Sequence, residues 1–231
     1  MKVSIIIPVY NEEKTILKII NKILKLKHLS KELIVVNDGS TDNTKNLLST
    51  LPKKRIKIIN HNKNLGKGAA IRTAKKYITG THVIIQDADL EYNPLDYKKL
   101  LKPFKKPNVS VVFGSRVLNK KRYKLKNFSS FERIFYNHIL TIISNIINGQ
   151  KLSDAHTCYK VFKNNIFKSM KLEENRFAFC PEITTKISNL NINIQEVPIS
   201  YHGRSYAEGK KITYLDGIRA IYVLFKYKFF I

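Results

Sequence analysis

The first half of the chain alternates between short, continuous apolar runs and longer stretches in which apolar residues recur every three or four positions. The short runs are typical of buried strands and occur at Val3–Val9, 33–36, 56–59, 82–85 and 109–113. The helical stretches run from about 12 to 26, from the turn at 38–42 to about 51, and from about 66 to 77. Continuous apolar strands separated by helices predict a parallel sheet that is covered on both faces.

The second half is less regular but repeats the same two patterns. It predicts a helix from Phe131 to about Ile147, a short strand at 160–162, a helix from about Glu182 and a strand at 192–197. A polar, basic loop over 201–211 then leads to an apolar and basic stretch at 214–231. No internal repeat or low-complexity linker divides the chain. We therefore predict one α/β domain over residues 1–211, with a mostly parallel central sheet, and a C-terminal amphipathic helix over 212–231.

Three polar loops follow predicted strands, at Pro8–Glu12, Asp38–Asp42 and Asp87–Glu91. Because ligands of such sheets bind outside the carboxyl ends of the strands, we expect the three loops to form one site. The third loop gathers three carboxylates, which repel one another unless a cation or a shared proton relieves them. Mg²⁺ and Mn²⁺ take oxygen ligands of this kind, often together with substrate phosphates. The alternative is a polar exit from a strand with no ligand.

Composition narrows the range of partners. The chain has 231 residues, enough for one sizeable core, and 43% of them are hydrophobic. Lys and Arg number 42 against 17 Asp and Glu, a formal net charge of +25, which favours nucleic acid, nucleotide phosphates or an anionic membrane surface. A coding bias toward lysine is the alternative origin of part of this charge. The two cysteines form no Cys-x-x-Cys pair, which argues against a disulfide framework or a cysteine-rich zinc site.

Signals in the sequence also predict where in the cell the protein is found. No signal peptide is visible, and no uninterrupted apolar stretch reaches the roughly 18 residues of a membrane span, so we expect a cytosolic protein. The last helix places apolar residues near one face, with Arg219, Lys226 and Lys228 elsewhere. It either packs on the domain or lies on an anionic membrane surface. In the second case the protein binds the cytoplasmic face peripherally or borrows an anchor from a partner protein.

Four motifs occur in order along the first half of the chain. They are Ile-Pro-Val-Tyr-Asn-Glu at 7–12, Val-Asn-Asp-Gly-Ser-Thr-Asp at 36–42, Asn-Leu-Gly-Lys-Gly at 64–68 and Asp-Ala-Asp at 87–89. In order and spacing they resemble the family 2 inverting glycosyltransferases, over roughly residues 3–118. The resemblance implies a GT-A-type, nucleotide-sugar-binding domain, with a donor half at about 1–118 and an acceptor half at about 119–211.

Two later segments narrow the resemblance. The run Gly114-Ser115-Arg116 and the pair Arg204 and Lys210 resemble the polyprenyl-phosphate hexosyltransferases, of which dolichyl-phosphate mannose synthase is the best-known type. This implies a donor such as GDP-mannose or a UDP-hexose and a polyprenyl phosphate as acceptor. The segment from 154 to 160 resembles the acceptor side of the same families, but it carries Cys-Tyr where the mannose synthase form has Gly followed by an aromatic residue.

The resemblance also implies a donor site. Pro8, Tyr10 and Glu12 would line the nucleoside pocket, and Asp38 would bind the base, unless it serves as an Asx-turn or helix cap. Val36 and Ala88 would contribute backbone contacts. The Gly-Lys-Gly at 66–68 has no Walker A register, so it is either a tight entrance to a helix or a phosphate contact through Lys67.

The metal ligands implied by the resemblance are Asp89 and Glu91. Asp87 would more readily contact the ribose or sugar of the donor. Many relatives of the mannose synthase type carry Gln at the position of Glu91, and the extra charge here leaves the choice between Mg²⁺ and Mn²⁺ open. The metal would neutralise the departing nucleoside diphosphate as a Lewis acid.

The nature of the acceptor decides which basic or acidic groups matter. A lipid monophosphate, with a second pKa near ~6, is already mostly dianionic and needs only positioning and charge screening. Arg116, Arg204 and Lys210 are candidates for clamping phosphates, and Arg133 is a further candidate. If the acceptor were instead a glycan or protein hydroxyl, a general base would be needed.

Asp154 and Glu182 are the candidates for that base, although Glu182 would also suit a helix N-terminus after its proline. The sequence thus predicts a metal-dependent inverting transfer of a hexose to a polyprenyl phosphate, with a hydroxyl acceptor as the rival. A non-catalytic nucleic-acid-binding protein is the distant rival. We expect no nucleic-acid partner, because the basic residues are spread along the chain and no recognised nucleic-acid module occurs.

Overall fold

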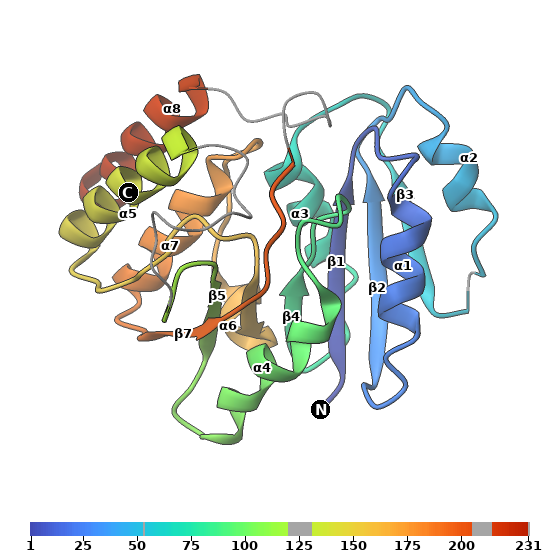
Figure 1. The fold of residues 1–231 in the computed structure, drawn as a ribbon, viewed down its shortest axis with the longest axis horizontal. Helices are drawn as coiled ribbons and strands as arrows, with labels where there is room; N and C mark the ends of the chain where they lie inside the picture. The colour runs from blue at the N-terminus through green and yellow to red at the C-terminus, as the bar shows by residue number, and fades with distance from the viewer. Residues whose placement is uncertain (53, 120–130, 205–213, 231) are drawn as a thin grey trace.

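The computed structural model describes residues 1–52, 54–119, 131–204 and 214–230. A seven-stranded sheet runs through the molecule in the order β3-β2-β1-β4-β6-β5-β7 (Figure 1). The strands are β1 (Val3–Val9), β2 (Lys31–Asn37), β3 (Ile56–Asn60), β4 (His82–Ile85), β5 (Val111–Ser115), β6 (Lys160–Lys163) and β7 (Ile194–Pro198). Every residue of β1 is buried, as its continuous apolar run predicts.

All strands except β6 run in one direction. The pairs β1–β2, β1–β4, β2–β3 and β5–β7 are parallel, whereas β6 is antiparallel to both β4 and β5. The carboxyl ends of the six parallel strands therefore lie at one edge of the sheet, and β6 starts from that edge. The predicted single α/β domain with a mostly parallel sheet is confirmed.

Helices cover both faces of the sheet. In Figure 1, α1 lies on the near side of the sheet and α3 on the far side, while α5, α7 and α8 form a separate layer at the end that carries β5 and β7. The α-helices are α1 (Ile16–Leu24), α2 (Thr44–Ser49), α3 (Lys67–Lys75), α4 (Tyr97–Leu101), α5 (Phe131–Asn148), α6 (Asn164–Ser169), α7 (Phe179–Asn189) and α8 (Tyr214–Phe225). Short 3₁₀ segments flank α4 at Pro94–Asp96 and Lys102–Lys105.

The structure differs from the predicted elements in a few places. Helices α4 and α6 were not predicted, because each is too short to show a helical repeat. The residue before α2 is Asn43, and the Asp42 carboxylate accepts the N–H of Thr44. The last helix changes to π-helix over Lys226–Phe230. Across the described part of the chain, we find no helix with the length and apolar character needed to cross a membrane.

Candidate active site

The three polar loops predicted from the sequence lie together at the carboxyl edge of the sheet. One follows β1 and carries Glu12, the second follows β2 and carries Asp38, and the third follows β4. Arg116 follows β5 on the same edge. The parallel pairing of β1 with β2 and β4 brings these segments together although they are far apart in sequence.

An acidic cluster surrounds one arginine at this edge. The Arg204 guanidinium donates to both carboxylate oxygens of Glu12 at 3.0 and 3.1 Å and to Oδ2 of Asp89 at 3.1 Å. Its backbone N–H donates to Oε1 of Glu91 at 2.9 Å, and the guanidinium Nε lies 3.8 Å from the same oxygen. We call Glu12, Asp89, Glu91 and Arg204 the acidic cluster. Arg204, which comes from the segment after β7, supplies the positive charge that these carboxylates need.

The charge in this cluster is not fully balanced. Burial and the neighbouring carboxylates of Asp87 and Glu91 raise the pKa of Asp89 to about 7, against the opposing pull of Arg204. Two buried carboxylates so close together favour any further cation that can reach them. Asp89 and Glu91 therefore offer the oxygen ligands that Mg²⁺ and Mn²⁺ prefer.

The residues that the structure describes do not supply a complete metal cage on their own. Within the described residues, no three or more His, Cys, Asp or Glu side chains are arranged to hold a metal ion. Mg²⁺ is commonly held by one or two carboxylates together with substrate phosphates. Asp89 and Glu91 fit that type of site, in which the remaining ligands come from a bound diphosphate and water.

A second ion pair lies beside the acidic cluster. Lys67, the first residue of α3, contacts the carboxylate of Asp87 and donates to Sγ of Cys158 at 3.3 Å. Burial would lower the pKa of Lys67, but the Asp87 carboxylate raises it well above its usual value, so the amine stays charged. Burial and Asp87 raise the pKa of Cys158, so this thiol is neutral. The structure thus joins the third and fourth motifs of the donor half to the acceptor-side segment at Cys158.

Asp38 is buried and holds the loop that leads into α3. Its carboxylate accepts the backbone N–H groups of Leu65 at 3.0 Å and Gly66 at 2.7 Å, and it lies 2.7 Å from Nδ1 of His61. Asp38 therefore organises a different loop rather than capping its own, which speaks against the alternative of an Asx-turn or helix cap. The predicted contact between Asp38 and a base stays a prediction.

The glycines at 66 and 68 make this arrangement possible. Gly66 has a φ of +99°, and a Cβ at Gly68 would lie 2.0 Å from the carbonyl oxygen of Glu174. Helix α3 can approach the 173–175 segment this closely because neither glycine has a side chain. The glycine pair is thus explained by close packing at the start of α3, and it places Lys67 next to Asp87.

The other predicted donor residues lie along the same edge. Pro8, Val36 and Ala88 are buried, and Tyr10 is half-buried where β1 ends. Their predicted contacts with a nucleoside remain predictions. Lys210 lies outside the described residues, and so does the side chain of Arg133, of which only the place in α5 is known.

Arg116 forms a buried, two-pronged ion pair with Asp154. Its Nε donates to Oδ2 at 2.7 Å and its Nη2 to Oδ1 at 2.8 Å, while its backbone N–H also donates to Oδ2 at 3.0 Å. Burial alone would raise the pKa of Asp154, but Arg116 outweighs that effect and holds it below its usual value. Asp154 is therefore a poor candidate for a general base, because both of its oxygens are committed to Arg116.

Glu182, the other candidate base, has a structural position. It is fully buried in α7, where its carboxylate accepts the backbone N–H groups of Glu173 and Glu174 and pairs with Lys186 at 2.9 Å. Glu182 thus holds the segment that packs against α3, and its expected place among the acceptor-side candidates stays a prediction.

Three tyrosines and a glutamine were missed by sequence reasoning. The Tyr201 hydroxyl donates to Oε2 of Glu91 at 2.9 Å, and its ring packs 5.1 Å from the Arg116 guanidinium, so it links the acidic cluster to the Arg116–Asp154 pair. Gln86 accepts hydroxyl donors from Tyr97 and Tyr159, both at 2.7 Å, beneath the loop that carries Asp87. Nothing in the sequence pattern marks these tyrosines, because their partners are more than ten residues away.

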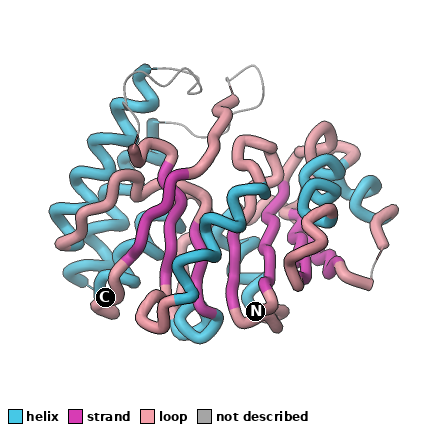
Figure 2. Tube along the Cα trace, turned by 60° about the horizontal axis from the view of Figure 1, so that its bottom comes forward, coloured by secondary structure: helices cyan, strands magenta, loops and turns pink. Residues whose placement is uncertain are grey.

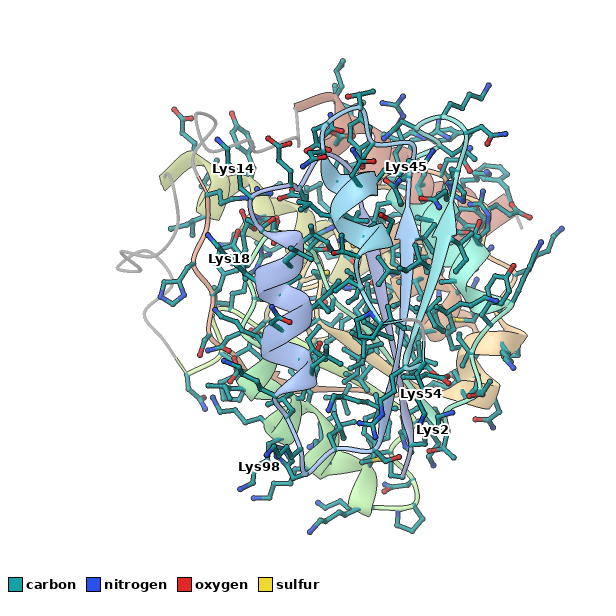
Figure 3. The ribbon with its side chains drawn as sticks, turned by 90° about the vertical axis from the view of Figure 1, so that its right-hand side faces the viewer. Lys2, Lys14, Lys18, Lys45, Lys54 and Lys98 are labelled. Atoms are coloured by element: carbon teal, nitrogen blue, oxygen red, sulfur yellow. The ribbon has the colours of Figure 1, made fainter. Side chains whose placement is uncertain are left out.

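The basic residues do not gather at one place on the side of the molecule that carries α1 and α2. Figure 3 shows Lys14, Lys18 and Lys45 near the upper part of this side, and Lys2, Lys54 and Lys98 near its lower part. These lysines are scattered over the surface rather than arranged as a stripe.

Comparisons with known proteins agree with the motifs. Residues 4–170 match the family model described as glycosyl transferase family 2. A dolichyl-phosphate beta-glucosyltransferase of Trichomonas vaginalis is 30% identical over 86% of this chain and 65% of its own length. A UDP-N-acetylglucosamine–dolichyl-phosphate N-acetylglucosaminyltransferase of Methanococcus voltae is 28% identical over 98% of this chain and 96% of its own length.

A solved structure shares the fold. Glucosyl-3-phosphoglycerate synthase from Mycobacterium tuberculosis, in complex with Mn²⁺, uridine diphosphate and phosphoglyceric acid, superposes with a TM-score of 0.73 at 18% identity. The match covers 99% of this chain and 78% of that one. At this identity the likeness shows the fold, and it agrees with the GT-A-type domain that the motifs predict.

Proposed function

Because the chain belongs to glycosyl transferase family 2, and is a glycosyltransferase, we propose that it transfers a hexose from a nucleotide sugar to a polyprenyl phosphate with inversion at the anomeric carbon. The observation that carries the proposal is the acidic cluster and its neighbouring Lys67–Asp87 pair, at the edge of the sheet where the donor motifs converge. The names of the relatives, which act on dolichyl phosphate, support this choice of acceptor.

Both acidic and basic side chains hold the donor. Tyr10 and Asp38 bind the nucleoside, and Lys67 holds the Asp87 carboxylate in place for its contact with the sugar. Of the two predicted donors, GDP-mannose and a UDP-hexose, we favour the UDP-hexose, because a relative is named for a UDP-sugar and the related fold was solved with uridine diphosphate.

The cofactor in this proposal is Mg²⁺ or Mn²⁺, held by Asp89 and Glu91. The metal supplies Lewis-acid charge to the diphosphate leaving group. Arg204 lies against both carboxylates, so it is placed to add a bidentate contact to the same phosphates.

The acceptor phosphate is positioned rather than deprotonated. Arg116 sits at the same edge, with its ion pair fixing the guanidinium in one orientation, and Tyr201 connects it to the acidic cluster. The rival acceptor, a glycan or protein hydroxyl, would need a free carboxylate base. Neither Asp154 nor Glu182 is placed to act as one, and this favours the phosphate acceptor.

The place of action follows from the acceptor. A polyprenyl phosphate resides in a membrane, so we propose that the protein works peripherally on the cytoplasmic face, through α8 or through an anchoring partner protein. The amphipathic character of α8, with exposed Leu215, Ile218 and Tyr222, supports the first route.

The test is a matrix of donors and acceptors with purified protein and Mg²⁺ or Mn²⁺. UDP-hexoses and GDP-mannose are each offered with a short-chain prenyl phosphate, with a prenol and with a free sugar. We expect turnover with a prenyl phosphate, loss of turnover with a chelator, and at least a hundredfold loss in Asp89→Asn. Turnover with a hydroxyl acceptor and none with prenyl phosphate would reject the proposal.

A further inference from the structure

Helix α5 turns its polar side inward and its apolar side outward. Thr141, Ser144 and Asn148 are buried, and they form hydrogen bonds inside the protein. The Thr141 hydroxyl accepts the N–H of Ala155 at 3.4 Å, and the Asn148 amide donates to the Ser144 hydroxyl at 3.3 Å. A helix whose outer face meets water shows the reverse distribution. The outer face of α5 therefore suits an apolar environment.

That outer face carries a regular stripe. Phe135, Ile139, Ile142 and Ile146 are spaced by four, three and four residues, the spacing that keeps side chains on one side of a helix. All four are exposed, and Ile146 reaches 77% exposure. Isolated exposed hydrophobic residues are ordinary, but a continuous row of them on one helix is not.

Helix α8 and the π-turn after it carry a second stripe of the same kind. Its members are large, exposed and spaced by three and four residues: Leu215, Ile218, Tyr222, Phe225 and Phe229. The opposite side of α8 is buried against the protein through Val223, Leu224 and Tyr227. The exposed stripe is thus additional to the residues that fix the helix to the domain.

The two stripes lie on neighbouring helices. Helices α5 and α8 pack against each other and against α7, and Figures 1 and 2 both place them in the outer layer at one end of the molecule. In the chain, α5 follows Arg116 and α8 follows Arg204, and both arginines lie at the active-site edge. We call the two stripes together the two-helix surface.

We propose that the two-helix surface docks on an anionic lipid bilayer, with α5 and α8 lying along the membrane and their apolar side chains inserted. This deepens the proposed function by naming the surface at which the acceptor is met, and it rests on that function only for the reason why a membrane is visited. Docking is supported by the exposed, regularly spaced apolar side chains and by the polar residues on the buried side of α5.

The charge around the surface favours lipid over a second copy of the chain. Arg219, Lys226 and Lys228 border the α8 stripe, and Glu174 contacts Arg219 at 3.0 Å and Lys226 at 3.2 Å. Aliphatic and aromatic side chains on one side with basic residues beside them are typical of helices in the membrane interface. Two copies of a chain with a net charge of +25 repel each other, whereas an anionic surface attracts each of them.

The experiment measures vesicle flotation of the full chain and of matched variants. One variant carries Ile142→Gln and Ile146→Gln in α5, and the other carries Ile218→Gln and Phe225→Gln in α8. Gln keeps helix propensity, and all four sites are exposed, so folding is preserved. The control is Leu95→Gln, which changes a residue that is 70% exposed outside the two-helix surface.

We expect the wild type and the control to float with phosphatidylserine-containing vesicles, more strongly than with phosphatidylcholine alone. The affinity of each double variant for the anionic vesicles should fall about tenfold, since each variant removes two inserted apolar side chains. Turnover on a water-soluble short-chain prenyl phosphate should be the same in all forms. That readout separates failure of docking from failure of the proposed function.

Three results would overturn the proposal. The first is no flotation of the wild type with anionic vesicles. The second is equal flotation of the α5 variant and the wild type, which would exclude α5 from the surface. The third is a wild-type dimer in light scattering that becomes monomeric in both variants without any binding to vesicles, which would assign the surface to self-association.

Discussion

At the scale of the residue, Arg204 has two possible sets of partners. In this structure its guanidinium contacts the carboxylates of Glu12 and Asp89, the second of which is a proposed metal ligand. A guanidinium and a divalent cation cannot occupy the same carboxylates without competing, because their charges repel. In the proposed function, Arg204 therefore holds the acidic cluster together until a metal and a diphosphate take over its partners.

Replacement of Arg204 by Gln should strengthen the binding of Mn²⁺ in the absence of a donor. The expected gain is about tenfold, from removal of one competing positive charge at contact distance in a partly buried site. Electron paramagnetic resonance of free Mn²⁺ reports the affinity without any need for turnover. Arg55→Gln, an exposed arginine ahead of β3, serves as the control. Unchanged or weaker Mn²⁺ binding in Arg204→Gln would show that Arg204 does not compete with the metal.

Asp154 gives a second prediction at this scale. Asp154→Asn leaves the buried Arg116 guanidinium without a counter-charge, which should lower the free energy of unfolding by about 3 kcal/mol. Denaturant titration measures the loss, and Glu132→Gln, at an exposed carboxylate of α5, is the control. If Asp154 were instead a general base, the variant would lose activity and keep its stability.

At the scale of the element, Glu32 joins three segments at the edge opposite the active site. Its carboxylate accepts the hydroxyl of Ser4 in β1 at 2.5 Å and the N–H of Thr79 before β4 at 2.8 Å, and it pairs with Lys2 at 2.8 Å. Burial would raise its pKa, but the hydrogen bonds of Lys2, Ser4 and Thr79 outweigh this effect and lower the pKa from 4.5 to about 2. The carboxylate thus ties β1 and β2 to the turn that starts β4.

Stability should therefore depend on pH through Glu32. A carboxylate with a lowered pKa in the folded state stabilises the protein above its unfolded pKa, and that contribution is lost as the pH falls through the folded pKa. Glu32→Gln should lower the free energy of unfolding by about 2 kcal/mol at pH 7, after allowance for its partial exposure. The difference from the wild type should shrink as the pH falls from 4.5 toward 2. A difference that stays constant over this range would refute the role of its charge.

At the scale of the whole molecule, the donor and acceptor halves are not separate folding units. Strand β6, from the acceptor half, lies between β4 and β5 of the donor half. Gln86 beneath the fourth motif needs the hydroxyl of Tyr159, which directly precedes β6. The active-site edge is therefore complete only when both halves are folded together.

A fragment of residues 1–118 should not fold by itself. It would leave β4 and β5 without the strand that joins them and would expose apolar side chains such as Val83 and Val112. We expect a broad, non-cooperative thermal transition and binding of a hydrophobic dye, compared with a cooperative transition of the full chain. A sharp transition with dispersed amide signals in the fragment would contradict this expectation.

The sequence by itself determined most of the local structure. The predicted strands lie close to the observed ones, because a strand that is buried on both faces is apolar along its whole length. Every residue of Val3–Val9, for example, is buried. The three polar loops were found for the same reason, since a strand that leaves the core must become polar at its end. The motifs also indicated the family before any coordinate was known.

The tertiary structure alone decided what each charged side chain contacts. The pairing of Arg116 with Asp154, and the contact of Arg204 with Glu12 across nearly the whole chain, depend on the order of strands in the sheet. The antiparallel direction of β6 and the outward apolar face of α5 are likewise invisible in a local pattern. A periodic row of apolar residues predicts a helix with two faces, but the neighbours that the fold supplies decide which face is inside.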